Sequence, residues 1–486
     1  MTARAGIVAV ALVALLGAEG STVTPPPDPR STADVGAEPA PAAPRPPRRR
    51  LNRADSSHRL LPSDLVYLGA IRLPDTGGSP PHTFEYGGQA MTYRPTGDPQ
   101  GGADGFPGSL FVAGIDTVHF VAEVAIPKPV VSATKDLDAL PVAHLLQPLA
   151  DVRGGLWPAL TEIPRAGLLW LSRPETGERL HLCYGQHFQQ DESTVVPSHA
   201  WLGTDLSAPG TQGAWWVGDE SLYSVNGYLF EIPDEWAATH TGGRSVGTGR
   251  FRDGGWSGMG PALFAVAPWH HGVPPPAGTR LQSVRLLRYR DSTEAGPEQA
   301  SVRLNTYQHP DEWEGGAWLT AADGRSAVVF VGTKGTGSVY WYGWINPAGA
   351  DVPCVESEGT GMVGCHWADG TTCPPAMIRE CAGHTSDRGW WSARFDAQMV
   401  FFDPDELASV AGGTSQPHEP QPYAVLDIDD ALFLPDPPVD PDAVGRGAQR
   451  RFRVGEMAYD RERGRLFVCE RLADGARPLI HVWQLR

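Results

Sequence analysis

Carboxylate, guanidinium and aromatic side chains occur together at several points that lie far apart in this sequence of 486 residues. Aromatic rings pack on the flat apolar faces of polar ligands such as saccharides, and carboxylates bind hydroxyl groups or cations. Two carboxylates can also act as the acid and the base of glycoside cleavage. The candidate ligand-binding residues are Glu85, Tyr86, Trp157, Trp256, Trp313, Glu314, Trp391, Arg394 and Glu456.

Pairs of short apolar runs joined by turns rich in Gly, Asp or Pro predict the elements that position these residues. The runs have strand length and lack the longer 3.6-residue period of a helix, so we expect β-hairpins. The four clearest pairs are 86–93 with 108–114, 157–163 with 168–172, 315–320 with 327–332, and 455–460 with 465–470. Weaker members are 260–268 and 395–404, and third strands are expected at 120–127, 227–233, 283–290, 339–344 and 479–486.

This repetition predicts an all-β fold, a β-propeller of about six blades, with five or seven as alternatives. The last hairpin and 479–486 supply three strands, so the apolar segment 64–74 is expected to join the C-terminal blade and close the ring. The innermost strands of a propeller line a central channel, and the residues that precede them converge at one end. The candidate residues are therefore expected to form a funnel there.

The N-terminal residues predict export. Arg4 and the apolar run 5–16, followed by small residues, resemble a signal peptide at 1–20 that is cleaved near Gly20. A Pro-, Ala- and Arg-rich linker is expected at 21–60, and a single propeller domain at 61–486 with a Cys-rich loop insertion at 351–392. We expect a secreted or periplasmic protein without a transmembrane segment, because the apolar run is too short to span a bilayer comfortably.

The composition limits the partners. The formal net charge of −17 argues against nucleic acid, which needs basic patches, and we expect a monomer that binds a small molecule or saccharide. The segment Gly332-Thr333-Lys334-Gly335 lacks the length and the following helix of a phosphate loop, so a turn with an exposed lysine is expected. No cofactor and no metal site are predicted, although a structural or funnel-bound divalent cation stays open.

The cysteines fit an exported protein. Cys354, Cys365, Cys373 and Cys381 are disulfide candidates in a long Gly- and Thr-rich loop, with zinc as the competing interpretation because His366 and His384 are near. Their pairing cannot be derived from the sequence. Cys183 and Cys469 lie in apolar strand patterns and are expected to be buried free thiols.

One family resemblance is present. The pattern Gly-x-Met/Ala-x-Tyr, a turn such as 460–464 and then Leu-Phe-Val resembles the blades of secreted bacterial β-propellers of the NHL and YVTN kind. Stretches 85–93, 227–236, 327–335, 387–391 and 420–426 look like a family of uncharacterised exported bacterial proteins, over most of 61–486. The resemblance implies a propeller and no particular activity.

Three functions are compatible with these features. The first is binding of a polar small molecule or saccharide in the central funnel. The second is an extracellular, glycan-directed hydrolase or lyase that uses funnel carboxylates. No catalytic residue is assigned, because the separation of the carboxylates decides that chemistry and cannot be inferred here. The third is an adhesion or scaffold protein whose funnel is filled by side chains.

Overall fold

The computed structural model describes residues 56–160, 164–186, 197–250, 258–290, 302–308, 310–341, 355–356, 363–364, 390–438 and 444–486. One compact unit spans Asp55–Arg486. The predicted signal peptide, the linker up to residue 55, Trp256 and the four disulfide-candidate cysteines lie outside the described residues.

Antiparallel sheets make up this unit. The first contains β2 (Met91–Arg94), β3 (Ser109–Ala113), β4 (Val121–Ala125) and β5 (Leu145–Ala150). The second contains β6 (Arg165–Arg173), β7 (Gly177–Gly185), β8 (His199–Leu202), β9 (Gln212–Val217) and the parallel β13 (Arg280–Leu281). The third contains β10 (Tyr228–Glu231), β11 (Val246–Gly249), β12 (Leu263–Val266) and β14 (Val284–Leu287).

Two more large sheets complete the set. The fourth contains β15 (Glu312–Thr320), β16 (Ser326–Trp341), β19 (Trp390–Phe402) and β20 (Ala424–Asp427). The fifth contains β21 (Val454–Asp460), β22 (Arg465–Asp474), β23 (Arg477–Leu485) and β1 (Leu65–Arg72), and a small pair joins β17 (Val355–Glu356) to β18 (Val363–Gly364). The described α-helices are α1 (Asp234–His240) and α4 (Pro404–Ala411). Short 3-10 turns lie at Ser56–His58, Pro62–Asp64, Gly101–Ala103, Leu137–Ala139, Leu222–Ser224 and Gly447–Gln449.

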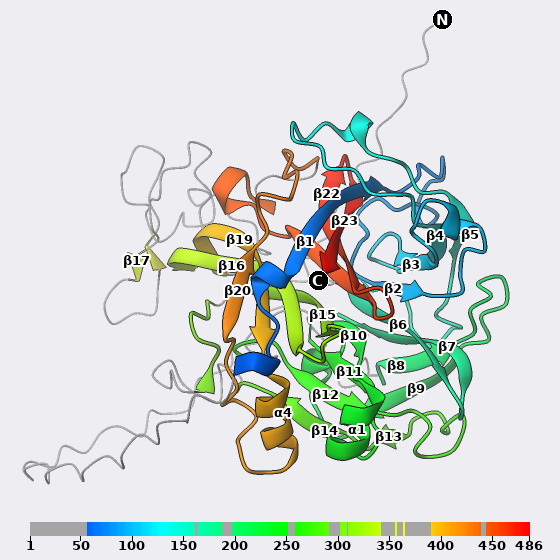
Figure 1. The fold of residues 1–486 in the computed structure, drawn as a ribbon, viewed down its shortest axis with the longest axis vertical. Helices are drawn as coiled ribbons and strands as arrows, with labels where there is room; N and C mark the ends of the chain where they lie inside the picture. Colours follow the sequence, from blue (N-terminus) through cyan, green and yellow to red (C-terminus); the bar gives the residue numbers. More distant parts are fainter. Residues whose placement is uncertain are drawn as a thin grey trace, which may run out of the picture. The chain divides into compact units, whose positions relative to one another are not determined.

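The five large sheets are the blades of a β-propeller (Figure 1). Their first strands β2, β6, β10, β15 and β21 are innermost, and each packs against the two neighbouring innermost strands, so the ring is closed. The propeller has five blades, which is one of the alternatives to the predicted six. Segments 260–268 and 395–404 were expected to be innermost, but β12 and β19 are third strands, whereas β10, expected to be a third strand, is innermost.

The ring closes between the two ends of the described chain, as the sequence predicts. Strand β1 pairs antiparallel with β23, from Leu65 opposite Leu485 to Arg72 opposite Leu479. The blade therefore takes three strands from its C-terminal segment and the fourth from its N-terminal segment.

The hydrophobic core lies between neighbouring blades. Among the described residues, five clusters of buried apolar side chains each join two adjacent sheets, and a sixth, smaller cluster surrounds Ala70 of β1. One of the five brings Ile71 of β1 and Val482 of β23 against Leu110 of β3. A blade strand is thus buried on both faces. Burial on both faces explains why segments such as Ala327–Val331 are continuously apolar and do not alternate between apolar and polar residues.

Glycines mark the points where innermost strands approach most closely. A Cβ atom on Gly315 would lie 2.6 Å from the backbone nitrogen of Met457, and one on Gly455 would lie 2.0 Å from the carbonyl oxygen of Gly88. No real Cβ atom tolerates such contacts, so the Gly-Gly of β15 and the Gly of β21 follow from the narrowness of a five-bladed ring.

A buried histidine makes the fold sensitive to acid. His181 on β7 is 2% exposed and packs edge-on against Trp201 and Trp269. Burial, assisted by nearby Arg173, lowers the pKa of His181 to about 3. The contribution of neutral His181 to the free energy of unfolding is therefore complete above the unfolded-state pKa of about 6.5. It is lost as the pH falls from there toward 3.

Replacing His181 with phenylalanine should remove this dependence. We expect the stability of the wild type relative to His181→Phe to fall by about 1.4 kcal/mol per pH unit below pH 6.5, or about 2 kcal/mol at pH 5. Urea unfolding of both proteins at pH 7.5, 6 and 5 measures the difference. Parallel pH profiles would contradict the neutral buried state of His181.

Candidate functional site

A cavity of about 240 Å³ lies in the central channel, where the innermost strands end. Residues of all five innermost strands line it, and it is called the axial cavity below. Cavities between converging elements of this kind are the usual place for small ligands in folded proteins.

Each innermost strand contributes one aromatic residue to the wall of the axial cavity. These residues are Tyr93, Trp170, Phe230, Trp318 and Tyr459. Trp170 and Tyr459 are half-buried, whereas the other three are buried and also pack in the cores between blades. The sequence prediction missed all five because it considered the residues before the innermost strands. The available signal was the repeated triplet ending in an aromatic residue: MTY, LLW, YLF, GAW and MAY.

Charged groups surround the mouth of the axial cavity. Glu231, which follows Phe230, accepts hydrogen bonds from Arg173 at 2.9 Å and from Arg461 at 3.0 Å. This carboxylate therefore links the ends of β6 and β10 to the turn after β21. Asp460 also lines the cavity, and burial raises the pKa of its carboxyl, although hydrogen bonding to the Arg463 backbone opposes the shift.

Glu456 is fully buried and directly precedes Met457, which lines the axial cavity. Glu456 Oε1 accepts a hydrogen bond from the Met457 amide at 3.0 Å, and the amides of Gly316 and Leu229 also favour its ionised form. Those amides belong to β21, β15 and β10, so the carboxyl must lie close to the channel axis. Burial outweighs them and raises the pKa of Glu456 well above its usual range, which favours the neutral acid.

Two β-bulges direct carboxylates into the channel. Strand β15 has an extra residue between Trp313 and Gly315, so Glu314 has no partner in the β15–β16 register. Strand β21 is irregular between Val454 and Met457, which places Glu456 in the same situation. Bulges re-aim side chains and recur beside functional sites.

The end of the channel where the innermost strands begin is filled by ion pairs. Arg165 binds Glu314 in a bidentate manner at 2.9 and 3.0 Å, and both side chains are almost completely buried. Arg471 lies 3.7 Å from Glu314 and 4.0 Å from Asp116, whose side chain is 26% exposed. The chain of charges therefore leads from the interior to solvent at Asp116.

The predicted site residues separate into distinct groups. Glu314 and Glu456 both lie in the channel, on the neighbouring innermost strands β15 and β21. Glu85 is exposed and Tyr86 is half-buried on the loop that enters β2, where Tyr86 lies near Asp116.

The predicted tryptophans have structural contacts. Trp157 is buried and donates a hydrogen bond from Nε1 to the carbonyl of Pro197 at 2.7 Å. Trp313 is fully buried in the core between the β10 and β15 blades. Neither occurs among the residues that line the axial cavity.

Trp391 and Arg394 do not precede an innermost strand, contrary to the prediction, because β19 is the third strand of its blade. The backbone of Trp391 pairs with Tyr340, and its side chain lies outside the described part of the chain. Arg394 is 58% exposed and forms an ion pair with Asp396.

The structure corrects the prediction for Lys334 and confirms the prediction for the two described cysteines. The expected turn with an exposed lysine is wrong: Lys334 lies within β16, is 3% exposed and pairs with Asp311 at 3.0 Å. Strand β16 continues through this segment because β19 pairs along its length. Cys183 and Cys469 are buried free thiols, as predicted.

Comparisons with known proteins suggest no function for this chain, so its function is inferred from the structure. No protein-family model matches the chain, and no curated protein matches its sequence. Among the described residues, no helix is long and apolar enough to cross a membrane. The structure defines a five-bladed β-propeller with a cavity at the centre of its ring.

Proposed function

We propose that this protein is an exported β-propeller that binds a saccharide or a similar polar small molecule in the axial cavity. The observation that carries the proposal is the wall of this cavity, to which every blade contributes an aromatic residue beside the Glu231 and Arg461 ion pair. Aromatic faces and fixed hydrogen-bonding groups together suit a ring that has hydroxyl groups at its edge and apolar faces.

The size of the axial cavity supports a small ligand. Its volume of about 240 Å³ lies below the range of about 300–1,000 Å³ that is usual for drug-sized ligands. One sugar residue of a longer glycan, or one free monosaccharide, is therefore the expected occupant. The mouth carries both arginines and carboxylates, so a neutral ring is favoured over a strongly charged one.

Export is part of the same proposal. The signal-peptide pattern at 1–20 and the resemblance to exported NHL and YVTN propellers support a secreted or periplasmic location, where glycans of cell surfaces are available. The acidic net charge of −17 suits a soluble protein that does not bind nucleic acid.

Trp170→Ala is expected to weaken glycan binding by about 1.5–3 kcal/mol, or roughly ten- to a hundredfold in Kd. Trp170 is half-buried in the wall of the axial cavity, at the edge of the core between the first two blades, so its truncation removes a stacking face. A glycan array with the wild type identifies a ligand, and calorimetry with that ligand measures the variant.

Trp216→Ala is the matched control. Trp216 is also half-buried, but it lies on the outer strand β9 under Arg280 and does not line the axial cavity. We expect this variant to bind like the wild type. Equal affinity in all three proteins would refute binding at the axial cavity.

A glycan-directed hydrolase is the second candidate, favoured by one observation. Asp460 and Glu231 both line the axial cavity, and their surroundings differ: burial raises the pKa of Asp460, whereas Glu231 is held between two guanidinium groups. Two carboxyl groups in unlike environments are the usual basis of acid and base roles. Release of reducing sugar by the wild type, absent in Asp460→Asn and Glu231→Gln, would favour the enzyme over the binding protein.

A further inference from the structure

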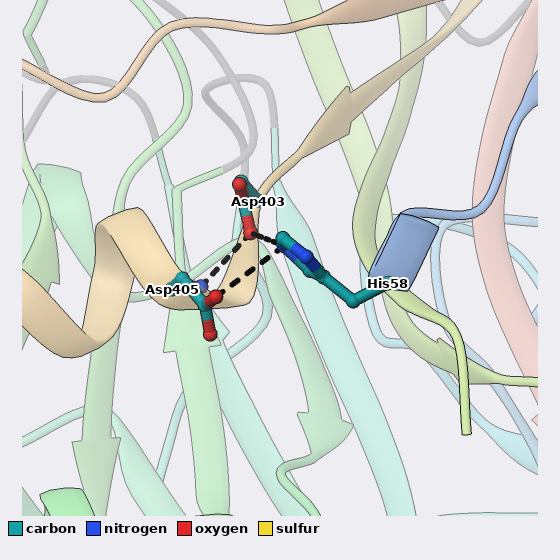
Figure 2. Close-up of side chains that lie close together, drawn as sticks. All are labelled: His58, Asp403 and Asp405. Atoms are coloured by element: carbon teal, nitrogen blue, oxygen red, sulfur yellow. Dashed lines mark hydrogen bonds and ion pairs between the residues drawn. The ribbon is translucent and has the colours of Figure 1, made fainter. Parts of the chain in front are cut away.

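Three side chains with metal-binding atoms meet where the N-terminal segment lies against the start of α4, and none of them lines the axial cavity (Figure 2). His58 ends the turn Ser56–His58, Asp403 caps α4, and Asp405 lies in its first turn. Nε2 of His58 is 3.2 Å from Oδ1 of Asp403 and 3.3 Å from Oδ2 of Asp405. One nitrogen and two oxygen donors thus converge from two segments.

The spacing of these donors matches the edges of a zinc tetrahedron. Zinc binds imidazole nitrogen and carboxylate oxygen at about 2.0–2.2 Å, which places neighbouring tetrahedral ligands about 3.3–3.5 Å apart. Calcium, by contrast, takes six to eight oxygen ligands and does not select imidazole. The mixed donor set therefore indicates zinc or a similar transition metal.

The surroundings of the cluster orient Asp403 and leave His58 and Asp405 open to solvent. Arg59 binds Oδ2 of Asp403 at 2.5 Å, and the Asp405 amide donates to Oδ1 of Asp403 at 3.0 Å. Hydrogen bonds of this kind hold carboxylate ligands in metal sites. Asp403 is 1% exposed, whereas His58 is 32% and Asp405 72% exposed, so solvent and metal have access from the side of these two residues.

The charge balance also favours a cation. Arg59 neutralises Asp403, and Asp405 has no described ion-pair partner except His58. With a neutral imidazole the cluster keeps one negative charge.

We propose that His58, Asp403 and Asp405 bind Zn²⁺, with water in the fourth position. The metal ties the segment before β1 to the blade that contains α4. The site stands independently of the axial cavity and of any ligand bound there.

Zinc titration of the metal-depleted full chain tests the proposal. We expect His58→Ala and Asp405→Asn each to lose one zinc equivalent, or at least tenfold in its affinity, relative to the wild type. Asp427→Asn is the matched control. Asp427 belongs to a second carboxylate cluster, with Asp396 and Asp429, in which Arg394 and Arg453 already form ion pairs.

Cobalt absorption separates this site from zinc bound by cysteines. Co²⁺ at the proposed site gives weak d–d bands without intense sulfur-to-metal charge transfer, and these bands should disappear in His58→Ala. Identical zinc stoichiometry and affinity in the wild type and both site variants would overturn the proposal. An equal loss in Asp427→Asn would also overturn it, because it would show nonspecific binding to surface acids. Thermal midpoints in chelator confirm that Asp405→Asn, an exposed position, is folded.

Discussion

Replacing Arg165 with methionine is expected to lower the free energy of unfolding by about 3–5 kcal/mol, the usual cost of breaking a buried ion pair from one side. Arg165 is 2% exposed and holds Glu314 through two hydrogen bonds at the centre of the ring. Without the guanidinium, Glu314 keeps only Arg471, at 3.7 Å, as a described partner. Urea unfolding at neutral pH measures the loss.

Two further variants show whether burial is the cause. Arg285→Met removes a similar bidentate pair with Glu220, but Arg285 is 49% exposed, so the expected loss is at most about 1 kcal/mol. The double variant Arg165→Met with Glu314→Leu removes both charges and should recover most of the stability. If Arg165→Met and Arg285→Met cost the same, the central ion pair does not have the role assigned to it.

Removing β1 is expected to prevent the formation of a stable propeller. Strand β1 and the residue after it bury Ala70, Ile71 and Leu73 completely or nearly so. Burial of one isoleucine or leucine side chain contributes about 1.5–3 kcal/mol, and a whole domain has only about 5–15 kcal/mol. A chain that begins at Asp75 should therefore lack a cooperative unfolding transition, whereas one that begins at Ser56 should retain it.

The truncated chain also exposes the edge of β23, which invites pairing with other chains. Light scattering should detect oligomers, and a synthetic peptide of residues 56–74 should restore the monomer and its cooperative transition. Peptide with reversed sequence serves as the control. A cooperative monomer that begins at Asp75 would show that the ring does not depend on this closure.

The sequence predicted the parts of the fold in which local turn chemistry and strand order agree. The hairpins β2–β3, β15–β16 and β21–β22 lie where the apolar pairs predict them, and the closing role of β1 follows from the unpaired segment 64–74. The favoured number of six blades was one too high, and the alternative of five is confirmed. An apolar strand with a glycine nearby looks the same in the first and the third position of a blade. Only pairing partners distinguish β12 from β10.

The second predicted hairpin failed for a physical reason. Gly167 suggested a turn at 164–167, but it lies inside β6, where a Cβ atom would be 2.8 Å from the Cα of Tyr228 on the neighbouring innermost strand. The turn is at the start of β7, where Gly177 has a φ of 66°. Glycine serves close approach in one place and a left-handed turn in the other, and sequence alone does not separate the two uses.

The candidate site was predicted only in part. Glu314 and Glu456 reach the channel because bulges redirect them, and glycines beside them gave a readable signal. The sequence did not predict the axial cavity. The packing of side chains from five blades decides which end of the channel stays hollow, and this packing is not visible in the sequence. The pairing of Glu314 with Arg165, 149 residues away, likewise follows from the closed ring.

The pairing of β1 with β23 sets the order in which the chain is able to fold during its synthesis. Leu65 precedes the other four blades in the chain, whereas its partner Leu485 follows all of them. The fifth blade therefore has to stay open while all the others are produced. Closing so long a loop is slow, and an incomplete ring exposes unpaired edges until that moment. The ring therefore cannot close before β23 has been synthesised.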